Sequence, residues 1–172
     1  DEDQYEIHEQ THSDKGSPIR ELFGDGQTGI TLLAWAAMLG NQFMIFALAL
    51  WMPTLLTQGG VPETTALFIL ALYSVGGVFG GWAFSVFADK YDPGRVLGFT
   101  FPLAALSVAA LAMSLGATPI LVTMAIVTGF FGIGSSFCLG PYVASLYPTR
   151  ARSTGIGWAL SIGRIGSIMS PL

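Results

Sequence analysis

The sequence predicts an all-α integral membrane protein with five membrane-spanning helices. Of its 172 residues, 52% are hydrophobic and only 10% are charged, whereas soluble domains carry about 25% charged residues. Beyond Asp25 the chain contains long runs without any charge, the longest from Val96 to Thr149. Because a bilayer core requires about 20 consecutive apolar residues of helix, these runs are long enough for several spans.

Residues 1–29 form a polar, acidic segment that holds eight of the eleven acids of the chain. Glycine and proline interrupt it repeatedly, so we expect a solvated, poorly ordered linker. The net charge of −4 therefore describes this tail and not a surface that recruits a partner. No basic patch for nucleic acid exists.

His8-Glu9-Gln10-Thr11-His12 matches the H-E-x-x-H pattern of zinc peptidases. That chemistry requires a rigid helix and a third ligand, and the chain has only two histidines. We therefore interpret the pattern as part of the linker and expect no metal and no cofactor. Cys138 lies inside an apolar run and is interpreted as a small buried hydrophobic residue.

Five spans follow from the apolar runs and the breakers between them. The first stops near Pro53, and the sequence GATP at 116–119 is a turn that divides the longest run into two helices. The fifth is still apolar when the chain ends, and both ends look like cuts in a longer protein. The expected spans are 30–52, 64–88, 96–115, 119–146 and 153–172.

Lysine and arginine indicate the orientation in the membrane. Six of the seven basic residues precede the first span or lie in the loops after the second and fourth spans, and the alternate loops have none. Because cytoplasmic loops are enriched in these residues, the sequence predicts that this face and the linker are cytoplasmic. The six residues are Lys15, Arg20, Lys90, Arg95, Arg150 and Arg152.

Small residues at helical spacing indicate close packing of two spans. The second span carries two interleaved GxxxG pairs, and the fourth has small residues four apart. We interpret both series as packing within one helix bundle and not as a dimer motif. The residues are Gly76, Gly77, Gly80 and Gly81 in the second span and Gly132, Ser136 and Gly140 in the fourth.

Two stretches, FADKYDPGRVL (87–97) and LYPTRARSTGIGWALSIGRIG (146–166), resemble the second half of a major facilitator superfamily transporter. Asp89-Lys90 and Gly94-Arg95 match the loop that joins helices eight and nine in that superfamily. The spacing is two residues longer, however, and Ser85 stands where a glycine is usual. WMPTLL (51–56), the YPTRARSTG loop and GRIG (163–166) are similar to the aromatic acid:proton symporters, which are permeases for benzoate-like acids.

The resemblance implies a multi-pass protein of the cell (inner) membrane. The five spans would be helices seven to eleven of twelve, residues 1–29 would end the central cytoplasmic loop, and the last helix would be missing. The partners would be the N-terminal half of the transporter, the lipid bilayer, a small organic acid and protons. The loop residues Asp89, Lys90, Arg95, Arg150 and Arg152 would latch one conformation, although positive-inside topology alone also explains their charges.

Arg164 is the one basic residue inside a span. A central arginine costs about 2.5–3.5 kcal/mol on insertion scales. At 100° per residue it lies in line with Gly157 and Ser161, between a bulky stripe suited to lipid and a small arc suited to helix packing. No acid lies within the five spans. Its partner is therefore a substrate carboxylate, which a guanidinium binds through two hydrogen bonds, or an acid of the missing half, or interfacial water reached by snorkelling.

Other polar and aromatic residues are weaker candidates for the substrate path. Asn41 and Gln42 are adjacent amides inside the first span, and such amides face protein or water. Some aromatic residues could stack on a substrate ring, although packing is the more common explanation for each of them. The aromatic candidates are Phe43, Phe46, Tyr73, Phe130 and Tyr142.

The sequence therefore favours part of a secondary transporter that moves a small organic anion, with an aromatic acid and proton symport implied by the resemblance. One alternative is a major facilitator transporter of a sugar, a dicarboxylate or a drug. Another is a non-transport membrane module such as a receptor or an intramembrane enzyme. The spans contain no Asp, Glu or His and only one Cys, which argues against an intramembrane hydrolase, and we expect no enzyme.

Overall fold

In the computed structural model, five helices account for nearly all of the described chain, which comprises residue 23 and residues 28–115, 117–149 and 151–172. Most of the predicted linker, including His8 and His12, lies outside these residues, as do Lys15, Arg20 and Arg150. The helices are α2 (Thr28–Gln58), α3 (Glu63–Lys90), α4 (Pro93–Met113), α5 (Thr118–Leu146) and α6 (Arg152–Met169).

The helix bounds lie close to the predicted spans except at the end of α2. The predicted stop at Pro53 is wrong, because α2 continues through this proline to Gln58. Proline removes one backbone hydrogen bond, but membrane helices tolerate this loss, and α4 and α5 also contain a proline, Pro102 and Pro141. The chain turns instead at Gly60, whose φ of 86° suits glycine, and the N–H of Val61 bonds to the carbonyl of Leu56 at 3.0 Å.

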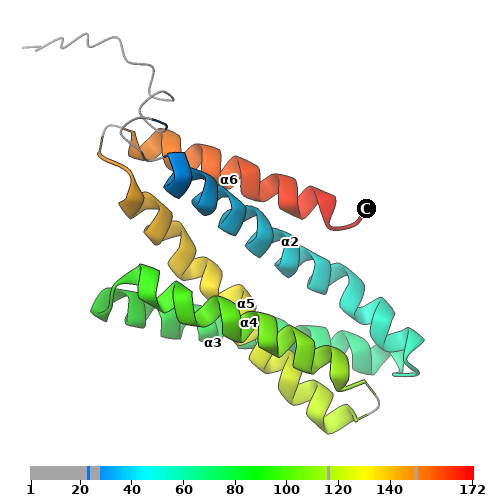
Figure 1. Cartoon of the computed structure of the whole chain (residues 1–172). Coiled ribbons are helices and arrows are strands. Elements are labelled where there is room, and N and C mark those ends of the chain that lie inside the picture. Colours follow the sequence, from blue (N-terminus) through cyan, green and yellow to red (C-terminus); the bar gives the residue numbers. More distant parts are fainter. Residues whose placement is uncertain (1–22, 24–27, 116, 150) are drawn as a thin grey trace, which may run out of the picture.

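Four of the five helices, α2 to α5, are long and apolar enough to span a membrane. The fifth, α6, has 18 residues and carries both Arg152 and Arg164 together with several Gly and Ser residues. It lies along α2 for its whole length (Figure 1). The chain is therefore a multi-pass, all-α membrane bundle.

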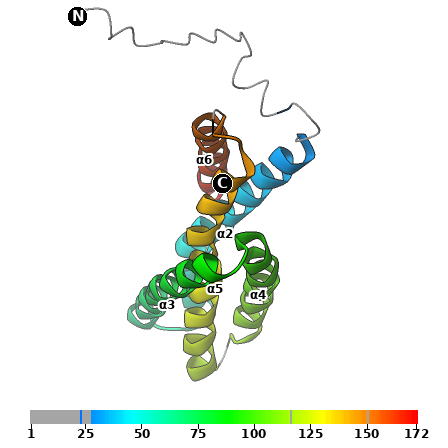
Figure 2. The ribbon, with the colours of Figure 1, turned by 90° about the vertical axis from the view of Figure 1, so that its left-hand side faces the viewer.

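Close contact between α3 and α5 forms the centre of the bundle, and α4 packs on the other side of α5 (Figure 2). A methyl group added at Gly76 or Gly80 would overlap the carbonyl oxygens of Ile126 and Phe130. The glycines of α3 therefore serve packing within the bundle, as predicted. In α5 the close approach is made by Gly129 and Gly134, whereas Gly140 of the predicted series has no atom within 4 Å of its Cβ position.

The pairing of α2 with α6 rests on a second set of small residues. Ala159, Gly163, Gly166 and Ser170 are buried along one stripe of α6. An added Cβ at Gly166 would overlap the carbonyl oxygen of Leu39. This stripe is the small arc that the helical wheel predicts, and it allows the two backbones to approach closely.

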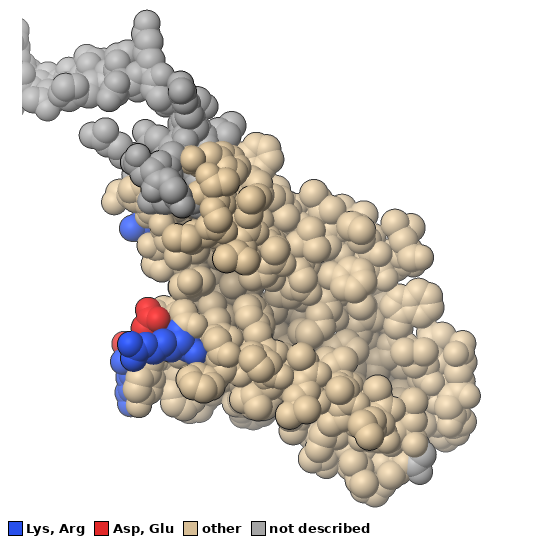
Figure 3. Space-filling view, in the orientation of Figure 1, with Lys and Arg blue, Asp and Glu red and all other residues tan. Residues whose placement is uncertain are grey.

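The two connections that carry most of the described charge lie at the same end of the bundle. In Figure 1 this is the left-hand end, where α3 turns into α4 and α5 turns into α6. Figure 3 shows basic and acidic side chains gathered there, while the other described residues visible on that face are uncharged. This distribution agrees with the positive-inside pattern of the sequence.

Candidate functional site

The connection between α3 and α4 is a short charged corner. Asp92 precedes α4, and its side chain accepts a hydrogen bond from the backbone N–H of Arg95 at 3.2 Å. With Pro93 as the first helical residue, this is a standard N-cap. Sequence reasoning gave Asp92 no role, although the Asp-Pro pair before an apolar run is a recognisable helix start.

The predicted latch residues that the structure describes, Asp89, Lys90, Arg95 and Arg152, are all exposed. Within the described residues, none of them forms an ion pair. Asp89 lies in the last turn of α3, and Arg152 begins α6. The corner thus presents exposed charges that have no ionic partner within the described residues.

Arg164 is exposed on α6, outside the stripe that packs against α2. Within the part of the chain that the structure describes, it has no acidic partner. The only acids of the described helices are Glu63 and Asp89, at opposite ends of α3. The guanidinium is therefore uncompensated inside this bundle.

Asn41 is 5% exposed and bonds α2 to α5. Its amide nitrogen donates to the hydroxyl of Ser135 at 3.0 Å, and its carbonyl oxygen accepts from the hydroxyl of Ser136 at 2.8 Å. Ser135 also donates to the carbonyl of Gly132 at 2.8 Å. Both ends of the amide are thus satisfied between helices, which indicates a packing role. The sequence does not reveal Ser135 and Ser136 as partners of Asn41, because they are 94 and 95 residues away in the chain.

We expect Asn41→Ala to destabilise the full-length protein by about 1–2 kcal/mol, since interhelical hydrogen bonds in membranes average about 0.6 kcal/mol and reach about 1.7. The measurement is thermal unfolding in detergent, with and without saturating ligand. If Asn41 only joins helices, the ligand raises the melting temperature of the variant and of the wild type equally. Loss of the ligand effect in Asn41→Ala would show instead that the amide contacts the ligand.

Gln42 and Phe43 lie on the side of α2 that contacts α6. The Cγ of Gln42 lies 3.2 Å from the Cβ position of Gly163, and the backbone N of Phe43 lies 3.2 Å from that of Gly166. Gln42 is half-buried, and Phe43 is 43% exposed. Phe46, on the same helix, is 41% exposed. Gln42 and Phe43 therefore flank the α2–α6 seam.

Tyr73 is buried in the core of the bundle. It is 1% exposed, and its hydroxyl has no hydrogen-bond partner within the described residues. Its neighbours in the cluster are apolar side chains of four helices. Phe130 packs edge-on against Phe84 at 5.2 Å between ring centroids. Tyr73 therefore offers no exposed surface to a ligand, whereas Phe130 is half-buried.

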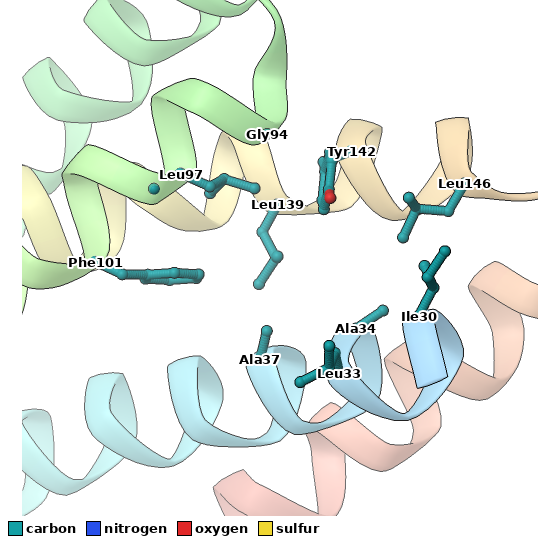
Figure 4. Close-up of a pocket in the computed structure, with 11 residues that line it drawn as sticks. Ile30, Leu33, Ala34, Ala37, Gly94, Leu97, Phe101, Leu139, Tyr142 and Leu146 are labelled. Carbon is teal, nitrogen blue, oxygen red and sulfur yellow. The ribbon is translucent and has the colours of Figure 1, made fainter. Parts of the chain in front are cut away.

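Tyr142 lines a cavity of about 290 Å³ between α2, α4 and α5, which we name the α2–α4 cavity. Figure 4 shows its hydroxyl directed toward α2, with Leu139 and Leu146 of α5 on either side and Leu97 and Phe101 of α4 further along the cavity. The remaining lining side chains are apolar and none is charged. The α2–α4 cavity could hold an apolar group, but it offers no cation for an acid.

The predicted substrate residues therefore do not meet in one pocket. Asn41 joins α2 to α5, Gln42 and Phe43 border α6, Tyr73 is in the core, and Tyr142 lines the α2–α4 cavity. Among the predicted substrate residues, only Arg164 combines exposure with an unpaired charge within the described residues. Within the described residues, no group of three His, Cys, Asp or Glu side chains could hold a metal.

Comparison with known proteins gives one family and several similar transporters. The profile of the Major Facilitator Superfamily matches residues 3–171. The 4-hydroxybenzoate transporter PcaK of Pseudomonas putida is 34% identical over 81% of the chain and 31% of its own length. A gallate transporter of Pseudomonas putida is 32% identical over 91% of the chain and 35% of its length.

The benzoate transport protein of Acinetobacter baylyi is 30% identical over 91% of the chain and 33% of its own length. The chain thus spans about a third of the length of these curated relatives. No solved structure matches it significantly.

Proposed function

The chain belongs to the Major Facilitator Superfamily, and from this premise we propose that the protein containing it transports small aromatic carboxylates together with protons. The chain is similar to transporters named for 4-hydroxybenzoate, gallate and benzoate. One observation carries the choice of an anion: Arg164 is exposed on α6, which the sequence predicts to be the fifth span, without an acid to neutralise it among the described residues. A planar guanidinium binds a carboxylate through two parallel hydrogen bonds.

The proposed mechanism is alternating access, in which this bundle rocks against the N-terminal half around a site near the middle of the membrane. The packed pairs α3–α5 and α2–α6 support movement as one body, since their backbones touch at glycines. The charged end of the bundle lies on the cytoplasmic side in this proposal. The proton carrier belongs to another part of the protein, because the acids of the described helices lie only at the ends of α3.

Uptake by the reconstituted full-length protein tests the proposal. Proteoliposomes under an imposed pH gradient receive labelled 4-hydroxybenzoate, a sugar or a cationic drug. Liposomes without protein are the necessary control, because a protonated aromatic acid crosses lipid unaided. We expect accumulation of the acid above this background that a protonophore abolishes. Accumulation of the sugar or the drug instead would favour a facilitator of another substrate class.

Asp89 is proposed to assist conformational switching, because it lies at a helix end far from the middle of the membrane. We expect Asp89→Asn to slow transport at least tenfold while the affinity for the acid stays within twofold of the wild type. The measurements are uptake rates in proteoliposomes and equilibrium binding in detergent. Asp92→Asn keeps the N-cap geometry at the same corner and is the matched control. If Asp89→Asn lost affinity for the acid but transported the acid that it still binds at the normal rate, the proposed role of Asp89 in switching would be refuted.

A further inference from the structure

We propose that the aromatic ring of the transported acid binds in a hollow on α6 formed by Thr154, Gly157, Trp158 and Ser161, with its carboxylate directed toward Arg164. This inference rests on the proposed function and assigns a subsite to it. We name this feature the α6 hollow. It is an open groove on one helix with a volume of about 340 Å³.

The α6 hollow lies on the side of the helix that faces away from α2. At 100° per residue, Gly157, Ser161 and Arg164 share one face, and the buried stripe of Ala159, Gly163 and Gly166 is on the opposite side. All three residues of the first group are exposed in this bundle. An arginine turned to lipid would be costly, so we infer that this face lines a water-filled path against the rest of the transporter.

Gly157 leaves room for a flat ring at the floor of the α6 hollow. No atom lies within 4 Å of the position where its Cβ would be. A planar group can therefore approach the helix backbone at this point more closely than at any residue with a side chain. Among the glycines of α6, the other three are in contact with neighbouring residues, which makes Gly157 the one whose lack of a side chain is not explained by packing.

Trp158 supplies an aromatic wall that is already fixed in place. Its ring stacks on Trp35 of α2 at 6.0 Å between centroids and 25° between planes. Phe23 in turn packs edge-on against Trp35 at 5.7 Å. Trp158 remains 44% exposed, so part of its surface is free for an offset contact with a substrate ring, the arrangement that aromatic pairs prefer.

The two hydroxyl groups of the α6 hollow suit a ring that carries a polar substituent. Ser161 donates its own proton to the carbonyl of Gly157 at 2.8 Å, and its oxygen can still accept a hydrogen bond. A helical side chain points back toward the N-terminus, which brings the Arg164 guanidinium toward the level of Ser161. Thr154 lies seven residues before Ser161, which is about 10.5 Å along the helix axis at about 1.5 Å per residue. One six-membered ring therefore fits between the Arg164 guanidinium and the hydroxyl of Thr154.

Filling the floor of the α6 hollow tests the proposal. In the full-length protein, Gly157→Leu places a side chain where no atom lies within 4 Å of the Cβ position. We expect the affinity for 4-hydroxybenzoate to fall at least tenfold. Gly29→Leu, another exposed helical glycine with nothing within 4 Å, is the control and should bind as the wild type. Binding by Gly157→Leu within twofold of Gly29→Leu would overturn the proposal.

Thr154→Val provides a second test that does not depend on added bulk. The variant keeps the shape of the side chain and removes its hydroxyl. We expect it to bind 4-hydroxybenzoate several-fold more weakly and benzoate unchanged; equal affinity of the variant and the wild type for both acids would contradict the predicted orientation of the ring. If the wild type binds no aromatic acid at all, the proposed function fails. If the wild type binds and only the Gly157→Leu result is negative, the α6 hollow alone is refuted.

Discussion

Replacing Arg164 with alanine is expected to weaken binding of the aromatic acid strongly and to leave the full-length protein folded. The expected loss is about 1.5–3 kcal/mol, the usual contribution of hydrogen bonds to charged groups, or about tenfold to a hundredfold in affinity. The fold should survive because Arg164 is exposed, has no ion pair within the described bundle and lies outside the α2–α6 seam. Equilibrium binding and thermal unfolding of the same purified sample measure both quantities.

Arg164→Lys tests whether binding depends on the positive charge of the side chain alone or also on the planar shape of the guanidinium. Lysine retains the positive charge and lacks the planar fork, so we expect insertion and stability like the wild type with weakened binding. The structural alternative is an ion pair between Arg164 and an acid of the other half. In that case Arg164→Ala would leave a buried carboxylate unpaired and destabilise the protein by about 3–5 kcal/mol. If Arg164→Ala lost stability while its folded fraction bound the aromatic acid with unchanged affinity, Arg164 would belong to the ion pair with the other half.

Gly80→Leu is expected to prevent stable packing of α3 against α5. The Cβ position of Gly80 overlaps the backbone of Phe130, and that of Gly134 lies 2.8 Å from the backbone carbonyl carbon of Gly80. Overpacking typically costs about 1–3 kcal/mol, and we expect about 3 kcal/mol here because the obstructing atoms are backbone and cannot change rotamer. The measurement is thermal unfolding of the full-length protein together with the yield of monodisperse protein.

The matched control is Gly98→Leu, an exposed glycine in α4 with no atom within 4 Å of its Cβ position. It makes the same chemical change in a neighbouring helix. If Gly98→Leu and Gly80→Leu unfold at the same temperature, the close approach of α3 and α5 does not hold the bundle together. A large loss confined to Gly80→Leu would support the packing described above.

The helices could be predicted well from the sequence because lipid imposes a simple length and composition rule. The division of the longest apolar run into α4, which ends at Met113, and α5, which begins at Thr118, follows from local sequence signals, as does the packing stripe of α6. The end of α2 did not follow, since Pro53 is a strong breaker in water but is tolerated in a membrane helix. Gly140 was misjudged because spacing identifies a face and cannot say which neighbour covers it.

The candidate site was less predictable than the helices. The sequence marks Arg164 because a charge in a span is rare, and its exposure on α6 agrees with the helical wheel. Asn41 is equally conspicuous, yet its amide bonds to Ser135 and Ser136. Pairing over such separations depends on how the helices pack. The α6 hollow also escaped prediction, because Trp158 is set by its contact with Trp35 on another helix.

The most direct test of the central claim compares 4-hydroxybenzoate with 4-hydroxybenzamide, which has the same ring but a neutral amide in place of the carboxylate. Equilibrium affinities of both ligands are measured for the full-length wild type and for Arg164→Ala. If the guanidinium holds the carboxylate, the wild type prefers the acid by about tenfold or more, in line with the strength of charged hydrogen bonds, and the variant binds both ligands equally. An undiminished preference for the acid in Arg164→Ala would contradict the claim.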